Sequence, residues 1–365
     1  MALHANAAWG ADPPLAGGRL TRTVEVTGMG RIYRIELPTP FPDGSVNAYL
    51  LPEDPCTLVD CGVAGAETMA ALERVLHRTG RSFSDLRQVV LTHLHIDHTG
   101  GLREVLERAP QAEVLIHTSA VAALCGDPAE LQRQRAFRRR FLMEAAMPRL
   151  PGGGREPRDE PRNEPWCPPR EFVHALADGG NLRAGGAAWR ILHTPGHSQS
   201  QICLHDGSRL ISSDHVMRDV AANAFIEPAA GGGLERPRAF PEYRRELLRV
   251  RGLPVRWVYP GHGVPFRGLR KVVDRRLRQQ DERCAHVLRL LAEGPQTAFS
   301  LARSMFPRLE GGAIFLGICQ AVGHCDLLED RGEVAARLQD GVISYERLAG
   351  SPVANGEIAS DRREE

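Results

Sequence analysis

The chain has 365 residues, 42% of them hydrophobic, and a formal net charge of +1 at pH 7. This length suffices for one large domain with a small one beside it, and the apolar content is that of a globular protein. The near-neutral charge supplies no overall field that would attract nucleic acid or an anionic membrane, which argues against both partners.

The two ends of the chain predict little structure. Residues 1–20 are rich in Ala, Gly and Pro, and residues 351–365 are polar and charged, so we expect both segments to be flexible. We expect no signal peptide, and no run of about 18 apolar residues predicts a membrane span. The eight cysteines are scattered singly, as in proteins whose thiols stay reduced in the cytoplasm.

The first third of the sequence predicts an α/β fold. Residues 31–37 alternate apolar and charged side chains, as a half-buried strand does, and apolar strands follow at 47–51, 57–59 and 88–92. Residues 65–79 place their apolar side chains on one face of a helix. The same alternation continues downstream and predicts a helix at 100–108 and strands at 113–117, 187–193 and 201–205.

Three imidazoles and a carboxylate follow the strand at 88–92 within six residues. These are His93, His95, Asp97 and His98. Imidazole is the commonest side-chain metal ligand, and a neighbouring carboxylate suits a divalent ion. Because α/β proteins place their chemistry at strand ends, we interpret this run as part of a metal site.

Matching ligands occur after later strand-like segments. His197 lies in a Thr-Pro-Gly-His sequence, Asp214 in Ser-Ser-Asp-His, and His262 in Pro-Gly-His-Gly. Each has Gly, Ser or Pro nearby, as expected for loops that follow strands. A site built from several strand-end loops requires this arrangement.

These motifs, in this order, resemble those of the metallo-β-lactamase-fold hydrolases. The likeness covers roughly residues 30–265 and begins with Leu-Val-Asp-Cys-Gly, which contains Asp60. It implies an αββα sandwich as the catalytic domain, at residues 21–265. It also implies that one metal ion is held by His93, His95 and His197, that a second is held by Asp97, His98 and His262, and that Asp214 bridges them.

Two divalent ions imply hydrolytic chemistry. Zinc is the expected metal, with iron or manganese as alternatives, and a pair of ions would lower the pKa of a shared water to give hydroxide at neutral pH. Asp97 is a candidate proton acceptor as well as a ligand. Asp60 is a candidate support for the ligand imidazoles, which usually need an acceptor on their second nitrogen; alternatively, it forms a strand-end turn.

Two segments interrupt the minimal fold. Residues 125–175 contain a helical, arginine-rich stretch and then a glycine- and proline-rich one, and we interpret them as a lid over the site. Its arginines, for instance Arg138, either hold an anionic substrate tail such as a coenzyme A phosphate or form a solvated helix face or a dimer contact. The second insertion, at residues 217–241, offers Asn223 and Phe225 as candidate substrate contacts or as parts of a plain surface loop.

Residues 266–350 predict a separate unit. An amphipathic helix at 270–293, a short helix at 297–306 and a third helix with apolar side chains at 313–329 precede two strands joined at Asp340-Gly341, a strong hairpin signal. This order resembles a winged-helix domain that accompanies some metallo-β-lactamase-fold hydrolases, including glyoxalase II relatives and an endoribonuclease group. The third helix is almost free of basic residues, which argues against phosphate contacts.

The sequence therefore favours a cytoplasmic, metal-dependent hydrolase of a small thioester or ester, linked to coenzyme A or a carrier protein. A lactonase and an endoribonuclease are the alternatives, and a non-hydrolytic iron or redox protein is a third. A β-lactamase in the strict sense is disfavoured, because the expected bridging aspartate is a feature of the hydrolase relatives. A homodimer is compatible with this interpretation.

Overall fold

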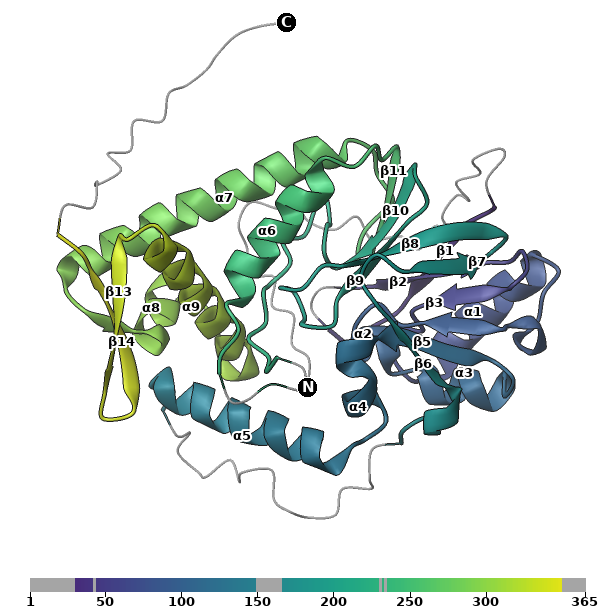
Figure 1. Cartoon of the computed structure of the whole chain (residues 1–365), viewed down its shortest axis with the longest axis horizontal. Helices are drawn as coiled ribbons and strands as arrows, with labels where there is room; N and C mark the ends of the chain where they lie inside the picture. Colours follow the sequence, from purple (N-terminus) through teal and green to yellow (C-terminus); the bar gives the residue numbers. More distant parts are fainter. Residues whose placement is uncertain (1–29, 42–43, 149–165, 230–231, 233–234, 350–365) are drawn as a thin grey trace, which may run out of the picture.

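The computed structural model describes residues 30–41, 44–148, 166–229, 232 and 235–349 (Figure 1). The predictions for residues 1–20 and 351–365, and for most of the glycine- and proline-rich part of the lid, lie outside these described residues.

The first sheet has six strands, and its order follows the chain from β1 to β6. Strand β2 is antiparallel to its neighbours β1 and β3, whereas β3, β4, β5 and β6 run parallel. The parallel strands bring their carboxyl ends to one edge. The strands are β1 (Tyr33–Leu37), β2 (Val46–Leu51), β3 (Thr57–Val59), β4 (Gln88–Val90), β5 (Glu113–His117) and β6 (Val173–Leu176).

The second sheet has five strands in the order β11-β10-β9-β8-β7. Only β10 and β11 are parallel, and the other neighbours are antiparallel. The strands are β7 (Asn181–Ala184), β8 (Ala187–His193), β9 (Ile202–His205), β10 (Arg209–Ser213) and β11 (Trp257–Pro260).

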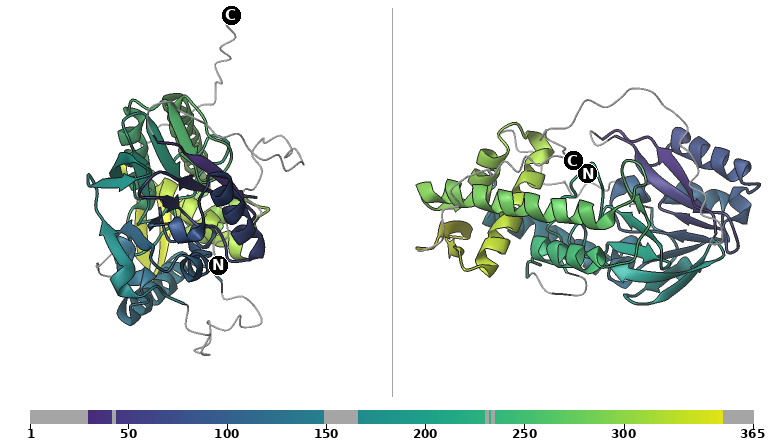
Figure 2. Two further views of the ribbon diagram at one scale, coloured as in Figure 1. Left: turned by 90° about the vertical axis from the view of Figure 1, so that its right-hand side faces the viewer. Right: turned by 90° about the horizontal axis from the view of Figure 1, so that it is seen from above.

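The two sheets pack face to face and helices cover their outer faces (Figures 1 and 2). Between the sheets lies an apolar layer that includes Trp189, Tyr49 and Tyr259, and the rings of the two tyrosines meet edge to face at 5.6 Å. Outside the first sheet, α1 (Ala66–Arg78) and α3 (Leu102–Arg108) bury one apolar side each. Outside the second, α6 (Ala239–Arg251) does so. The predicted αββα sandwich is confirmed.

The helical part of the first insertion bridges the sandwich and the C-terminal unit (Figure 1). Helix α4 (Val121–Leu124) is followed by α5 (Pro128–Glu144). Asp127 caps the N-terminus of α5, because its carboxylate accepts hydrogen bonds from two backbone amides of the first turn. Its buried Phe137 and Phe141 join the same core as α6. The insertion ends earlier than residue 175, because β6 completes the first sheet.

The C-terminal unit contains the predicted helices and hairpin. These elements are α7 (Leu269–Leu290), β12 (Gln296–Thr297), α8 (Ala298–Met305), α9 (Ile314–Asp330), β13 (Val334–Gln339) and β14 (Val342–Arg347). Asp340 and Gly341 both have positive φ, 51° and 79°, as a two-residue hairpin turn requires. The winged-helix assignment stays a prediction. Short 3₁₀ turns complete the fold: η1 (Phe83–Asp85), η2 (Thr118–Ala120), η3 (Arg170–Phe172), η4 (Leu291–Glu293) and η5 (Gly311–Ala313).

Helix α9 is the central element of the C-terminal unit. With η5 it spans Gly311–Asp330, and by length and composition this segment is apolar enough to cross a membrane. The sequence analysis expected no such apolar segment. However, 72% of the apolar window is buried inside the protein. It packs against α6, α7 and α8. Its buried Asp326 accepts two hydrogen bonds from Arg236, at 2.6 and 2.7 Å. These contacts are those of a core helix.

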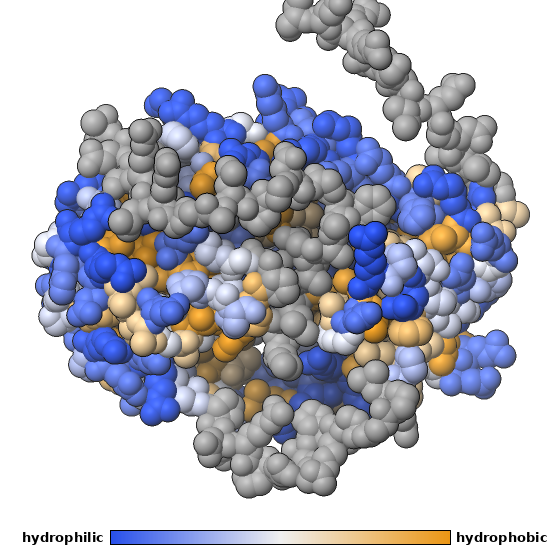
Figure 3. Space-filling model, turned by 180° about the vertical axis from the view of Figure 1, so that it is seen from behind, coloured by the Kyte–Doolittle hydropathy of each residue, from blue (hydrophilic) through white to orange (hydrophobic). Residues whose placement is uncertain are grey.

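The large exposed apolar side chains come from separate elements, and hydrophilic and hydrophobic residues are interspersed on the face that Figure 3 shows. They are Ile96, Met143, Trp166, Phe172, Leu248, Val264 and Leu338. The homodimer stays a prediction.

Acid should destabilise the protein through His324, which is fully buried in α9. Burial lowers its pKa from 6.5 to about 3, so the folded protein holds the ring neutral while the unfolded chain protonates it below pH 6.5. Unfolding therefore takes up a proton between about pH 6.5 and 3. We expect the free energy of unfolding to fall in this window by up to about 1.4 kcal/mol per pH unit from this group.

Urea unfolding of wild type and His324→Leu between pH 7 and pH 5, in one metal state, measures this effect. The variant should lose less stability on acidification than the wild type. Leu328→Ala in the same helix is the control, because the cavity it creates should cost about 2–5 kcal/mol at every pH. Parallel pH profiles for His324→Leu and wild type would show that His324 does not contribute.

Candidate metal centre

Five strand ends carry the predicted site. Asp60 follows β3 and the His93 run follows β4, both in the first sheet, whereas Asp214 follows β10 and His262 follows β11 in the second. His197 lies in the loop between β8 and β9. The structure therefore brings together side chains that are up to 169 residues apart, since all seven predicted ligands fall into three overlapping groups of possible metal ligands.

The first group contains His93, His95 and His197. His95 Nδ1 lies 3.0 Å from His93 Nε2 and 3.0 Å from His197 Nε2. Three imidazole nitrogens thus face one another, and each residue is at most 8% exposed. Because a neutral imidazole has one nitrogen lone pair, this trio suits one divalent cation.

The second group contains Asp97, His98 and His262. His262 Nε2 lies 3.4 Å from Asp97 Oδ2, and His98 Nε2 lies 3.8 Å from the same oxygen. Asp214 lies between the two groups. Its Oδ2 is 3.3 Å from His197 Nε2 and 3.6 Å from His262 Nε2, and its Oδ1 is 3.5 Å from His98 Nε2.

The outward nitrogens of these imidazoles have fixed acceptors. His98 Nδ1 lies 2.8 Å from Asp60 Oδ2, His197 Nδ1 lies 2.8 Å from the Asn223 carbonyl, and His262 Nδ1 lies 2.9 Å from the Ser45 carbonyl. Such partners fix the orientation of a ligand ring. Asp60 therefore lies within hydrogen-bond distance of a candidate ligand ring, and its supporting role stays a prediction.

Asp60 is itself held by the chain around it. It has a positive φ of 58°, a conformation that aspartate tolerates better than most residues. Its carboxylate accepts hydrogen bonds from the Thr92 amide and hydroxyl at 2.8 and 2.9 Å. The end of β3 is therefore tied to the end of β4, directly beneath the His93 run.

Negative charge shapes the electrostatics of the site. Burial alone would lower the pKa of His98, but Asp214, Asp97 and Asp60 outweigh it and raise the pKa well above 6.5. His262 likewise has its pKa raised to about 10, against burial, mainly by Asp214. Burial and the neighbouring imidazoles lower the pKa of His93 instead. The carboxylates thus favour positive charge at the second group of ligands.

The donor set fits a divalent metal. Neither oxygen of Asp214 nor Nε2 of His98 has a hydrogen-bond partner among the described residues, although both side chains are fully buried. Leaving such atoms unsatisfied costs about 1–3 kcal/mol each, and more if charged. A cation between them would remove this cost.

A single helical turn positions the later residues of the His93 run. A short helix, α2 (Ile96–Thr99), starts directly after His95 and projects Asp97 and His98 from one turn. The helix predicted at residues 100–108 corresponds to α3, which begins at Leu102. The short helix α2 that precedes it was not predicted.

The candidate substrate residues lie at different distances from the ligands. The Phe225 ring contacts those of His95 and His197, with centroids 4.6 and 5.5 Å apart. Asn223 turns its side chain to α9 instead: Oδ1 accepts a hydrogen bond from Gln320 at 2.8 Å, and Nδ2 donates to the Leu316 carbonyl at 3.3 Å. Arg138 is exposed and stacks on Phe315, 5.2 Å from the ring centroid. Their roles toward substrate stay predictions.

Two supporting residues escaped the sequence analysis. Gln320 belongs to a helix that the sequence indicated as apolar packing, yet it holds Asn223, whose carbonyl orients His197. Glu227 lies in the second insertion, and its Oε1 is 3.7 Å from His95 Nε2. Neither carries a motif or a spacing that would identify it from sequence.

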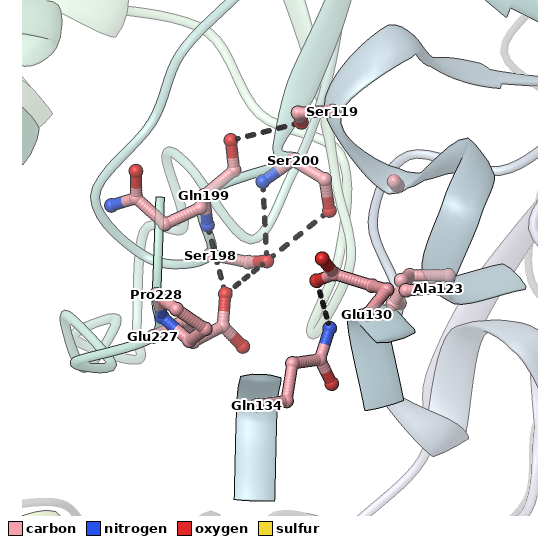
Figure 4. A pocket seen from close by; sticks show the side chains of 11 residues that line it. Ser119, Ala123, Glu130, Gln134, Ser198, Gln199, Ser200, Glu227 and Pro228 are labelled. Carbon is pink, nitrogen blue, oxygen red and sulfur yellow. Dashed lines mark hydrogen bonds between the residues drawn. The ribbon is translucent and has the colours of Figure 1, made fainter. Parts of the chain in front are cut away.

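A polar pocket of about 220 Å³ adjoins the ligand loops. Figure 4 shows Glu130 and Gln134 of α5 facing Ser198, Ser200 and Glu227 across it. None of the described residues that line it is an arginine or a lysine. The lid helix therefore contributes a carboxylate and an amide to this pocket, rather than the arginines that the sequence analysis emphasised.

Gly261→Ala should abolish metal binding at the shared ligand. A Cβ at residue 261 would lie 1.9 Å from Asp214 Oδ1 and 3.0 Å from His98 Cε1, so the ligands must move. Gly252→Ala is the control, because its Cβ would meet no atom closer than 4.0 Å. Zinc stoichiometry of the purified variants, with circular dichroism to verify folding, tests this. Full zinc content in a folded Gly261→Ala protein would contradict the site geometry.

Gln320→Ala should weaken metal binding from a distance. Losing its hydrogen bond frees the Asn223 segment that orients His197, and removing such outer partners typically costs about 10–100-fold in metal affinity. Gln296→Ala is the control: it loses a comparable hydrogen bond, to the Leu290 carbonyl, elsewhere in the C-terminal unit. Chelator competition measures the affinity, and equal values for the two variants would contradict this coupling.

Comparisons with known proteins agree with the site. The family model described as "Metallo-beta-lactamase superfamily" matches residues 41–262. The chain is 30% identical over 319 residues to "Probable metallo-hydrolase YqjP" of Bacillus subtilis (strain 168), an alignment that covers 87% of this chain and 98% of that protein. It is similar to the crystal structure of a metallo-beta-lactamase family protein from Thermus thermophilus, with 25% identity, a TM-score of 0.68, and coverage of 87% and 98%.

A further relative is named for a specific activity. It is "Atrochrysone carboxyl ACP thioesterase" of Aspergillus fumigatus, which is 24% identical over 238 residues, and the alignment covers 65% of this chain but only 41% of that protein. The stretch that the family model matches contains all seven predicted ligands. The chain belongs to the metallo-β-lactamase superfamily.

Proposed function

We propose that this protein is a metal-dependent thioesterase that cleaves a small acyl group from coenzyme A or from a carrier protein. The observation that carries the proposal is the pair of ligand groups joined through Asp214, His93-His95-His197 and Asp97-His98-His262. The thioesterase among the relatives supports the thioester as substrate.

The residues have distinct roles in this proposal. The two trios would each hold one divalent ion, zinc in the first instance, and Asp214 would contact both. When bound, two such ions lower the pKa of a water and polarise the scissile carbonyl. Asp97 is fully buried beside His262, where its carboxylate can take up the proton of the attacking water. The carbon–sulfur bond would then break, and the leaving thiolate would take up the proton that Asp97 accepted from the water.

The arginines of the lid helix α5 are candidates for contact with coenzyme A or a carrier protein. Arg133 is engaged within the protein, because it donates to Glu130 and to the Ala229 carbonyl. Arg135, Arg138, Arg139 and Arg140 remain on the exposed side of α5, where they could meet the phosphates of coenzyme A or an acidic carrier protein. Arg138 thus stays a candidate for substrate contact at the rim.

The geometry gives less support to a nucleic-acid substrate. The helix that would enter a groove, α9, contains no arginine or lysine and is largely buried. Nucleic-acid binding requires basic side chains at the contact surface. We therefore propose an intracellular enzyme acting on acyl thioesters, and not on RNA.

Turnover of a thioester panel by zinc-loaded and metal-free protein tests this proposal. Acyl-CoA and carrier-linked thioesters of several chain lengths should be hydrolysed, with matched oxygen esters, lactones and an RNA oligonucleotide as comparison substrates. Metal removal should abolish turnover and zinc should restore it. His95→Ala should lower the turnover rate by more than the roughly 100-fold that loss of a hydrogen-bond partner of a ligand costs. His174 has a side chain that is 48% exposed, and His174→Ala should retain full activity.

Two outcomes would contradict the proposal. Thioester hydrolysis that persists in the metal-free protein or in His95→Ala would place the chemistry elsewhere. Turnover of lactones or RNA, with no turnover of any thioester, would keep the metal site but overturn the substrate class.

A further inference from the structure

We propose that Glu227 is a positioning residue for the metal ligand His95 and thereby tightens metal binding at the His93-His95-His197 trio. The proposal rests on the metal-dependent function above but not on the identity of the substrate. Glu227 lies in the loop between β10 and α6, outside the motifs that the sequence analysis used.

The two nitrogens of His95 face in different directions. Nδ1 lies among the trio, 3.0 Å from His93 Nε2 and His197 Nε2. Nε2 lies on the opposite side of the ring, 3.7 Å from Glu227 Oε1. If Nδ1 binds a metal, the remaining proton must be on Nε2, so a carboxylate there is the acceptor that ligand imidazoles usually have.

The other oxygen of Glu227 is fixed to the His197 loop. Oε2 accepts hydrogen bonds from Ser198 Oγ at 2.8 Å and from the Gln199 amide at 2.9 Å. One carboxylate therefore links a ligand ring to the two residues that directly follow another ligand.

The loop around Glu227 is anchored on both sides. The Phe225 amide donates to the His197 carbonyl at 3.1 Å, and the Phe225 ring packs against His95. Two residues after Glu227, the Ala229 carbonyl accepts a hydrogen bond from Arg133 of α5, at 2.6 Å. These contacts hold the carboxylate in place, so it can direct the ring.

The separation of 3.7 Å exceeds the usual 2.7–3.2 Å of an N–H···O hydrogen bond. It is too short for an intervening water, so the carboxylate acts on the ring directly. Its charge also adds to that of Asp97 and Asp214, which favours a dication. Among the described residues, Glu227 forms an ion pair with His95 and with no arginine or lysine, so this charge is not neutralised by a fixed cation.

Three variants test the proposal in the full-length protein. Glu227→Ala removes the acceptor, and Glu227→Gln keeps an oxygen that can accept but removes the charge. Glu144→Gln is the control, because it changes a carboxylate of α5 that pairs with Arg140. Zinc affinity is measured by competition with a chromophoric chelator. The ¹H shift and exchange rate of His95 Nε2–H are followed by NMR in the zinc-loaded protein.

We expect Glu227→Ala to lower zinc affinity at one of the sites by about 10–100-fold, and to move the His95 Nε2–H resonance upfield with faster exchange. Glu227→Gln should recover part of both effects, and Glu144→Gln should change neither. Wild-type affinity and an unmoved resonance in Glu227→Ala would overturn the proposal. Because both readouts are independent of substrate, a protein that binds zinc but cleaves no thioester would contradict the proposed function and leave the role of Glu227 testable.

Discussion

The structure depends on one electrostatic constraint. Buried ring nitrogens and carboxylate oxygens that have few hydrogen bonds to one another must be held within a few ångströms of one another. His93, His95 and His197 face one another with three ring nitrogens, and Asp214 lies next to the imidazoles of both groups. Burying such groups costs free energy unless a cation occupies the space between them. The rest of the fold can be understood as what holds this arrangement together.

Both sheets contribute to that support, and so does the C-terminal unit. Asp60 ties the first sheet to His98, and Gly261 lets the end of β11 approach Asp214 where no Cβ would fit. Asn223 connects α9 with His197 through its side chain and its carbonyl. A unit that looks like an appendage in the sequence is thus coupled to the ligands.

Much of the site could be predicted from sequence because its ligands sit in short motifs after strands. The order of those motifs was sufficient to predict that seven side chains meet, and in the structure these side chains lie close together. Apolar runs and amphipathic segments predicted only an α/β fold; the αββα layers were implied by the resemblance of the motifs to those of the metallo-β-lactamase-fold hydrolases.

The remaining features depend on contacts between distant segments, which periodicity does not encode. The turn of helix at Ile96–Thr99 is too short to give a periodic pattern. Helix α6 falls partly within what the sequence suggested was an insertion loop. Gln320 was hidden in an apolar helix, and Glu227 in a loop without a motif; only their spatial partners identify them. The substrate cannot be read from the ligands, because the same donor set serves several hydrolytic reactions.

The central claim is that this chain cages two divalent ions, and anomalous X-ray diffraction at the zinc edge from crystals of zinc-reconstituted protein tests it most directly. We expect two anomalous peaks, one among His93, His95 and His197 and the other among Asp97, His98 and His262, with Asp214 in contact with both. A map without peaks at these positions after reconstitution would contradict the account.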